Sequence, residues 1–102
     1  MSTNSQYIGM ARFNLKGGVT VEQFLQAENA VRQGIIQQQP GYQGRDVFQD
    51  AEGRWLIIMR WDSKETCDAW AAIFKGLDEG KTFSSLMDFS SARGENYTLV
   101  HP

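Results

Sequence analysis

Two arginines lie within strongly apolar stretches of the sequence, where a positive charge needs a negative partner. Arg12 lies in QYIGMARFNL and Arg60 in WLIIMRW. One interpretation is functional: a guanidinium presents several N–H donors at once and can bind a phenolate, enolate or carboxylate of a ligand. The other is structural, because burying an unpaired charge is costly and an ion pair to Asp46 or Asp62 removes that cost.

Aromatic side chains recur at a spacing that favours a shared apolar surface. Trp61 and Trp70 are nine residues apart, and Phe74 follows one helical turn after Trp70. We expect an apolar pocket, with charge supplied by Arg12 or Arg60. The alternative is that the same side chains only fill a core. The expected pocket walls are Trp61, Trp70, Phe74, Phe83 and Met87.

Reactive side chains of other kinds do not form a set. The chain has one cysteine, Cys67, and one histidine, His101, which excludes an internal disulfide and argues against a Cys/His zinc site. Cys67 precedes Trp70 by about one helical turn, so we expect a packed thiol rather than a nucleophile. Asp88 is either a proton acceptor or a solvated surface group. We therefore expect no metal and no cofactor, and we assign no catalytic residue.

The composition is that of an ordinary globular protein. Hydrophobic residues make up 41% and charged residues 22% of 102 residues, and the net charge is −2. We expect one domain over residues 1–102, with residues 1–5 flexible. The lysines and arginines form no basic stripe, so nucleic-acid binding is not expected. No apolar run reaches the ~20 residues that span a bilayer, and no secretory signal is visible, so a soluble cytoplasmic protein is expected.

The first half of the chain predicts a strand followed by a helix. Residues 6–15 alternate as a strand, with apolar side chains on both faces. Thr20 and Gln23 have the spacing of a capping box, which places the start of a helix near Val21. Pro40 ends this segment. The expected buried stripe of the helix is Phe24, Ala27, Val31 and Ile35.

The second half predicts a hairpin, a helical region and a last strand. Strands at 42–49 and 55–61 flank a turn at 50–53. A helix capped by Asp62 follows, residues 78–80 break it, and residues 82–89 form a second short helix. Residues 96–100 form the last strand. The order β-α-β-β-α-β predicts an α+β, ferredoxin-like fold: an antiparallel sheet with helices on one face and the first and third strands innermost.

Both innermost strands are apolar on both faces, which a lone subunit cannot cover. The helices shelter either the series Trp55, Ile57, Met59 and Trp61 or the series that contains Leu56 and Ile58. Each large apolar side chain left in water forfeits roughly 1.5–3 kcal/mol, and exposed patches of this size mark interfaces. We therefore expect a homodimer formed through the open face of the sheet.

Several segments of the chain resemble a known family. The segments FNLKGGVTVEQFLQA, QQQPGYQGRDVF and WLIIMRWDSKETCDAWAAIF are similar to the dimeric α/β-barrel proteins, in particular the antibiotic-biosynthesis monooxygenases. The resemblance implies two sheets that pair into a barrel and a ligand held between each sheet and its helices. It also implies cofactor-free oxygenation of an aromatic substrate, in which the carbanion of the substrate itself reacts with oxygen.

Haem-degrading members of this superfamily also carry a tryptophan nine residues after the strand-end tryptophan, as Trp70 follows Trp61. Their asparagine on the first strand would fall near Met10 or Ala11, and their histidine near Gly80. Neither is present, so haem degradation is not expected. The leading hypothesis is a monooxygenase-like protein acting on an aromatic or similarly flat hydrophobic molecule. The alternatives are a non-catalytic small-molecule binder or stress-related barrel, and a purely structural dimer.

Overall fold

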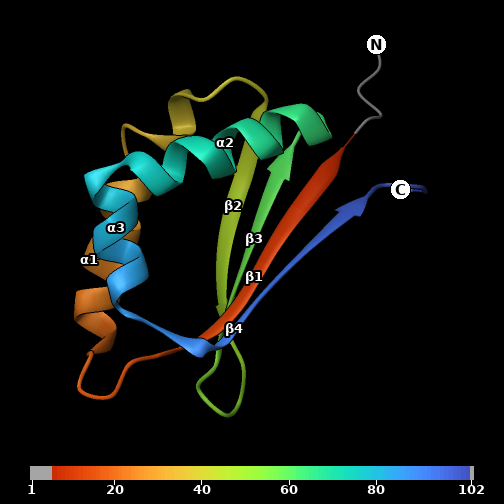
Figure 1. The fold of residues 1–102 in the computed structure, drawn as a ribbon. Coiled ribbons are helices and arrows are strands. Elements are labelled where there is room, and N and C mark those ends of the chain that lie inside the picture. Colours follow the sequence, from red (N-terminus) through yellow and green to blue (C-terminus); the bar gives the residue numbers. More distant parts are fainter. Residues whose placement is uncertain (1–5, 102) are drawn as a thin grey trace.

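Four strands form one antiparallel sheet, and every helix lies on the same side of it (Figure 1). The computed structural model describes residues 6–101. Residues 1–5, for which flexibility was expected, lie outside the described part. The strand order is β2-β3-β1-β4, which confirms that the first and third strands are innermost and that the fold is ferredoxin-like. The strands are β1 (Tyr7–Leu15), β2 (Tyr42–Gln49), β3 (Trp55–Trp61) and β4 (Met87–Thr98).

The first helix, α1 (Val21–Arg32), begins where the capping box predicted. The hydroxyl of Thr20 accepts from the backbone N–H of Gln23 at 3.1 Å, and the Gln23 side chain accepts from the N–H of Thr20 at 2.8 Å. The helix ends well before Pro40 and is followed by the short 3-10 helix η1 (Ile36–Gln38). Consequently Ile36 is fully buried, whereas Ile35, expected on the helical stripe, is only half-buried.

The second helix, α2 (Lys64–Gly76), is capped one residue later than predicted. The hydroxyl of Ser63 accepts from the N–H of Thr66 at 3.3 Å, so Ser63 is the N-cap. Asp62 instead accepts a hydrogen bond from the hydroxyl of Thr66 at 2.8 Å. The expectation of an Asp62 cap is therefore wrong, because the Ser63 side chain accepts from the amide of the third helical residue, whereas Asp62 binds the hydroxyl of Thr66.

The third helix, α3 (Asp78–Ser85), starts at the residues that were expected to break the helical region. The chain turns at Leu77, which has extended backbone angles, and helix resumes at once. Gly80 is buried, and a Cβ at this position would lie 2.0 Å from the carbonyl oxygen of Phe74. This glycine therefore allows α3 to approach the end of α2 closely, rather than ending a helix.

The last strand, β4, begins at Met87 and is far longer than the predicted strand at 96–100. Its polar middle pairs with β1 along the edge of the sheet, and the register shifts between Arg12 and Asn14. At that bulge the hydroxyl of Ser91 accepts from the backbone N–H of Asn14 at 2.8 Å. An edge strand is held by its backbone, so its low hydrophobicity gave no strand signal.

Burial decides which face of the sheet meets the helices. Trp55, Ile57 and Trp61 of β3 are buried beneath the helices, together with Tyr7 and Phe13 of β1. The alternate positions lie on the face that no helix covers (Figure 1). We call this surface the open face; its half-buried apolar residues on the two inner strands are Ile8, Met10, Leu56 and Ile58.

Candidate functional site

Four aromatic rings contact one another in a row: one from the end of β3, two from α2 and one from α3. The ring centroids of Trp61 and Trp70 lie 6.3 Å apart, those of Trp70 and Phe74 5.5 Å, and those of Phe74 and Phe83 5.9 Å. We call Trp61, Trp70, Phe74 and Phe83 the aromatic cluster. Met87 of β4 packs half-buried against the same core. The structure thus brings together the four aromatic residues that the sequence grouped.

The indole of Trp61 carries the one unsatisfied buried side-chain polar atom found among residues 6–101. Trp61 is fully buried, and its Nε1 has no hydrogen-bond partner. The rings of Tyr42 and Trp70 flank it at centroid distances of 5.9 and 6.3 Å. A buried donor without an acceptor costs about 1–3 kcal/mol, so an oxygen atom of a bound molecule at this N–H would be favourable.

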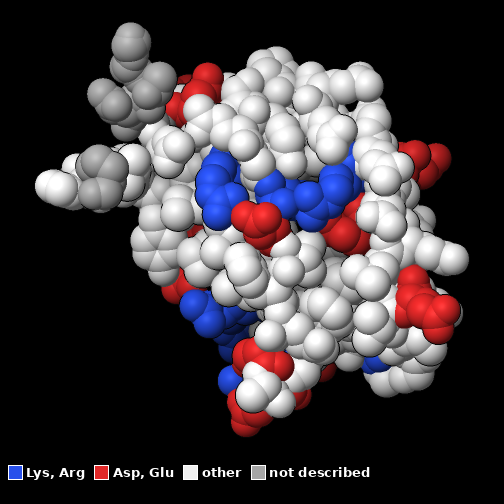
Figure 2. Space-filling model, turned by 180° about the vertical axis from the view of Figure 1, so that it is seen from behind, with Lys and Arg blue, Asp and Glu red and all other residues white. Residues whose placement is uncertain are grey.

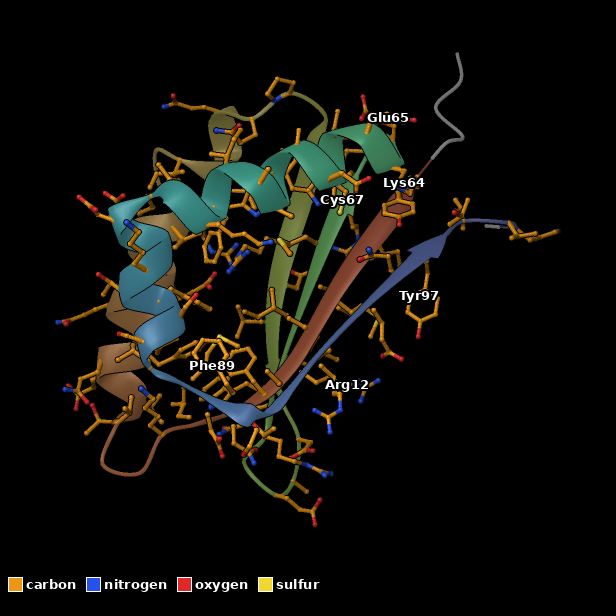
Figure 3. The ribbon with its side chains drawn as sticks, in the orientation of Figure 1. Arg12, Lys64, Glu65, Cys67, Phe89 and Tyr97 are labelled. Carbon is orange, nitrogen blue, oxygen red and sulfur yellow. The ribbon has the colours of Figure 1, made fainter. Side chains whose placement is uncertain are left out.

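The two arginines considered for the pocket lie on the open face instead. Arg60 Nη1 donates to Asp46 at 2.6 Å, as the structural interpretation proposed. Arg12 Nε lies 3.6 Å from a carboxylate oxygen of Glu95, and its side chain points away from the helices (Figure 3). The structure therefore separates Arg12 and Arg60 from the aromatic cluster by the thickness of the sheet.

A buried ion pair that the sequence analysis missed lies beside the aromatic cluster. Arg45 of β2 donates from Nε and Nη2 to the two carboxylate oxygens of Glu28 on α1, at 2.9 and 2.8 Å. Arg32 adds a third bond to Glu28 at 3.0 Å. Glu28 and Arg45 are 2% and 5% exposed. The guanidinium carbon of Arg45 lies 5.8 Å from the ring centre of Phe83.

The missed pair left one signal in the sequence. Glu28 lies four residues after Phe24 and four before Arg32, which places it at the edge of the buried stripe of α1. A charge at such a position demands a partner. Seen from behind, the molecule shows positive and negative groups side by side in a band (Figure 2).

The remaining titratable candidates are occupied or shielded. Cys67 is 7% exposed, and burial raises the pKa of its thiol above the ordinary value, which confirms the expected packed thiol. Its side chain lies beneath α2 (Figure 3). Asp88 accepts from the backbone and hydroxyl of Ser90 at 3.0 and 2.7 Å. Within residues 6–101, no group of three or more His, Cys, Asp or Glu side chains is placed to hold a metal ion.

Gly80, near which the resemblance would place the histidine of haem-degrading proteins, has no space for a side chain. The chain has glycine at residue 80, and the carbonyl of Phe74 would overlap with any Cβ there. The only histidine in the sequence, His101, lies near the C-terminus. Because a haem iron needs an axial ligand, the residues at this site do not fit haem.

No helix in the part of the chain that the structure describes is long and apolar enough to cross a membrane.

Comparison with protein families identifies a relation over most of the fold. The family model described as antibiotic biosynthesis monooxygenase matches residues 7–72, which run from β1 into α2. The chain belongs to this family. None of the curated proteins matches it in sequence. Membership agrees with the resemblance carried by the strand-end tryptophan and the helix that follows it.

Solved structures of low sequence identity share the fold over almost the whole chain. SnoaB, a cofactor-independent oxygenase from Streptomyces nogalater, superposes with a TM-score of 0.79 at 13% identity, covering 96% of both chains. A dimeric ferredoxin-like protein from an uncultured marine organism gives 0.76 at 14% identity, covering 99% of this chain and 94% of its own. The haem-degrading protein Rv3592 from Mycobacterium tuberculosis gives 0.63 at 19% identity, covering 96% and 94%.

Proposed function

We propose that this protein is a small, cofactor-independent monooxygenase-like enzyme that acts on an aromatic or similarly flat hydrophobic molecule bound at the aromatic cluster. Family membership supports oxygenase chemistry. The observation that carries the proposal is the unsatisfied Nε1 of Trp61, a buried donor among aromatic rings. Such a donor suits a ligand that is apolar over most of its surface and presents one oxygen atom.

The residues of the cluster would bind and polarise the substrate rather than attack it. The rings of Trp70 and Phe74 pack against each other, and a flat substrate would bind by inserting among these apolar rings. The Trp61 N–H would donate to a phenolic or enolic oxygen and stabilise the negative charge that forms when the substrate loses a proton. The substrate supplies all the electrons: one atom of O₂ enters its carbon framework, the other leaves as water, and a methylene becomes a carbonyl.

An oxygen-consumption assay with a tricyclic anthrone tests this function. We expect one O₂ to be consumed for each quinone formed. Trp61→Phe removes the N–H and should lower kcat/KM about tenfold or more, the effect of losing a hydrogen bond to a charged group. Trp55→Phe is the matched control, because Trp55 is buried on the same face of the same strand but packs on Phe24. A folded wild-type protein that forms no quinone contradicts the proposal.

A non-catalytic binding protein is the second candidate, and one observation favours it. Among the described residues, the acidic and thiol side chains considered as bases are not free at the cluster: Asp88 is bonded to Ser90, and Cys67 is a shielded thiol. Quenching of tryptophan fluorescence by the anthrone separates the candidates. Saturable quenching without oxygen uptake supports the binding protein, and no quenching at all supports a purely structural role.

We also propose that the protein forms a homodimer through the open face. A second copy would cover Ile8, Met10, Leu56 and Ile58, which a single subunit leaves half-buried. Phe48 and Tyr97 on the outer strands are 47% and 46% exposed and would lose contact with water at the same interface. The dimeric state of a ferredoxin-like protein with the same fold supports this arrangement.

A further inference from the structure

A row of three residues crosses the inner part of the sheet beneath α2. Arg45 of β2 is the cross-strand partner of Met59 on β3, and Met59 is the partner of Gly9 on β1. Met59 precedes Trp61 by two residues and packs against the buried core, so the row lies on the helix-covered face. A Cβ at Gly9 would lie 3.3 Å from Sγ of Cys67 and 3.8 Å from Cε of Met59. The row therefore borders the aromatic cluster and lies away from the open face.

Met59 is the member of this row that can move. The other side chains on its face of β3, those of Trp55, Ile57 and Trp61, are buried, whereas Met59 is half-buried. Methionine is unbranched and has three rotatable side-chain bonds, so it adapts easily to a changed neighbour. Met59 therefore fills the space beside Arg45 without being locked into it.

Arg45 has one N–H group bound to a poor acceptor. Its Nε and Nη2 donate to the carboxylate of Glu28, but its Nη1 donates to Sδ of Met59 at 3.0 Å. A thioether sulfur is a weak acceptor, whereas a guanidinium forms its strongest hydrogen bonds with anionic oxygens. Arg45 is 5% exposed, so bulk water does not reach this donor. The sulfur thus occupies a place at which an anionic oxygen would bind more strongly.

The charges around Arg45 also favour one more anion. Glu28 is paired with two arginines, Arg45 and Arg32, so two positive charges face one negative charge in this network. The guanidinium carbon of Arg45 lies 5.8 Å from the ring centre of Phe83, which belongs to the aromatic cluster. An anionic group on a ligand held among the rings would therefore balance the excess positive charge.

We propose that Arg45 binds an acidic oxygen of the ligand and thereby selects flat aromatic anions over neutral aromatic molecules. A carboxylate or an ionised phenol would replace the Met59 sulfur at Nη1, while the rings of the ligand lie among the aromatic cluster. Trp61 lies two residues from Met59 on the same face of β3, so one ligand can contact both its Nε1 and Arg45. The inference rests on the proposed ligand site at the aromatic cluster, but it does not depend on oxygenation.

Quenching of tryptophan fluorescence by anthracene-2-carboxylate and by the neutral anthracene-2-carboxamide tests this selection at neutral pH. We expect the acid to bind about tenfold more tightly than the amide, or better. Arg45→Lys keeps a positive charge beside Glu28 but removes the planar set of N–H donors. It should weaken acid binding about tenfold and leave amide binding unchanged. Arg60→Lys is the matched control: Arg60 pairs with Asp46 on the open face, and both affinities should stay as in the wild type.

Met59→Leu tests the contact from the other side. Leucine keeps the apolar volume but has no sulfur, so Nη1 of the free protein loses its acceptor. A buried donor without an acceptor costs about 1–3 kcal/mol, and an anionic oxygen of the ligand would relieve that cost. We therefore expect the ratio of acid affinity to amide affinity to rise about fivefold or more.

Three results would overturn the selection by Arg45 and leave the aromatic site standing. They are equal wild-type affinity for the acid and the amide, an Arg45→Lys variant that keeps the wild-type preference, and an unchanged preference in Met59→Leu. Failure of the wild type to bind either ligand would overturn the aromatic site together with this inference. Circular dichroism verifies the fold of each variant. Selection requires no turnover, so a protein that oxidises no anthrone is still expected to prefer the acid.

Discussion

The two faces of the sheet hold ion pairs in opposite environments, buried on one face and half-exposed on the other. On the helix-covered face, Glu28 and Arg45 are almost completely buried. Arg45 donates two short hydrogen bonds to Glu28, and Arg32 donates a third. On the open face, the side chains of Arg60 and Asp46 form one contact while 40% and 50% exposed. Both faces have apolar neighbours along the same strands, so the difference lies in what covers them.

This contrast shows that burial beneath other elements, rather than sequence pattern, determines how much the loss of one member of an ion pair destabilises the fold. A buried pair that loses one member leaves a charge that water cannot reach, which is strongly destabilising. An exposed pair that loses one member leaves a charge that water solvates. The half-exposed ion pairs of the open face can therefore be broken at little cost in stability, whereas the ion pairs of Glu28 hold α1 against β2.

The largest effect is expected from Glu28→Gln. This change leaves the buried Arg45 without its counter-ion, and we expect the free energy of unfolding to fall by about 3–5 kcal/mol. Asp46→Asn makes the equivalent change on the open face and should cost less than about 1 kcal/mol. Urea denaturation of both variants measures the difference. Similar losses in the two variants would show that the faces do not differ as described.

A second comparison uses glycines, one from each side of the sheet. Gly80→Ala places a methyl group against the carbonyl of Phe74 and should lower the free energy of unfolding by about 3 kcal/mol. Gly44→Ala on the open face meets only the guanidinium end of Arg60, at 3.5 Å, and should change stability by less than about 1 kcal/mol. Thermal unfolding checks both. An unaffected Gly80→Ala variant would mean that α3 is not packed closely on α2.

The smallest change concerns the thiol of Cys67 on the helix-covered face. Burial raises the pKa of this thiol above its ordinary value, so the reactive thiolate is scarcer in the native protein than in the unfolded chain. We expect a disulfide reagent to modify the native protein at least tenfold more slowly than the urea-unfolded chain. Because the pKa is raised on folding, the associated stability is present below the ordinary thiol pKa and is lost as the pH rises through the native pKa. Equal rates in native and unfolded protein would contradict the shielding.

The sequence predicted the elements that depend on apolar pattern or on capping. The capping box at Thr20 fixes the start of α1, and the doubly apolar strand at 55–61 leads to its inner place in the sheet and to the proposal of a second copy. Backbone pairing is less visible, so the polar half of β4 was missed. Partners distant in sequence are less visible still: nothing in the local pattern of β2 shows that Arg45 reaches Glu28 rather than solvent.

In the candidate site, too, local spacing was predictable from the sequence and contacts between distant residues were not. The aromatic cluster could be grouped from helical and strand spacing, because Trp61, Trp70 and Phe74 share one side of their elements. The unsatisfied Nε1 of Trp61 could not, since satisfaction of a hydrogen bond depends on every neighbour in space.

Sedimentation velocity at micromolar concentration tests most directly whether the open face is an interface between copies. The chain has a mass of 11.5 kDa, and we expect a species of twice that mass, dissociated by Ile58→Glu, which puts a charge at the centre of the open face. A wild-type protein that sediments as a stable single chain would contradict the claim that one face of the sheet is built for the helices and the other for a partner.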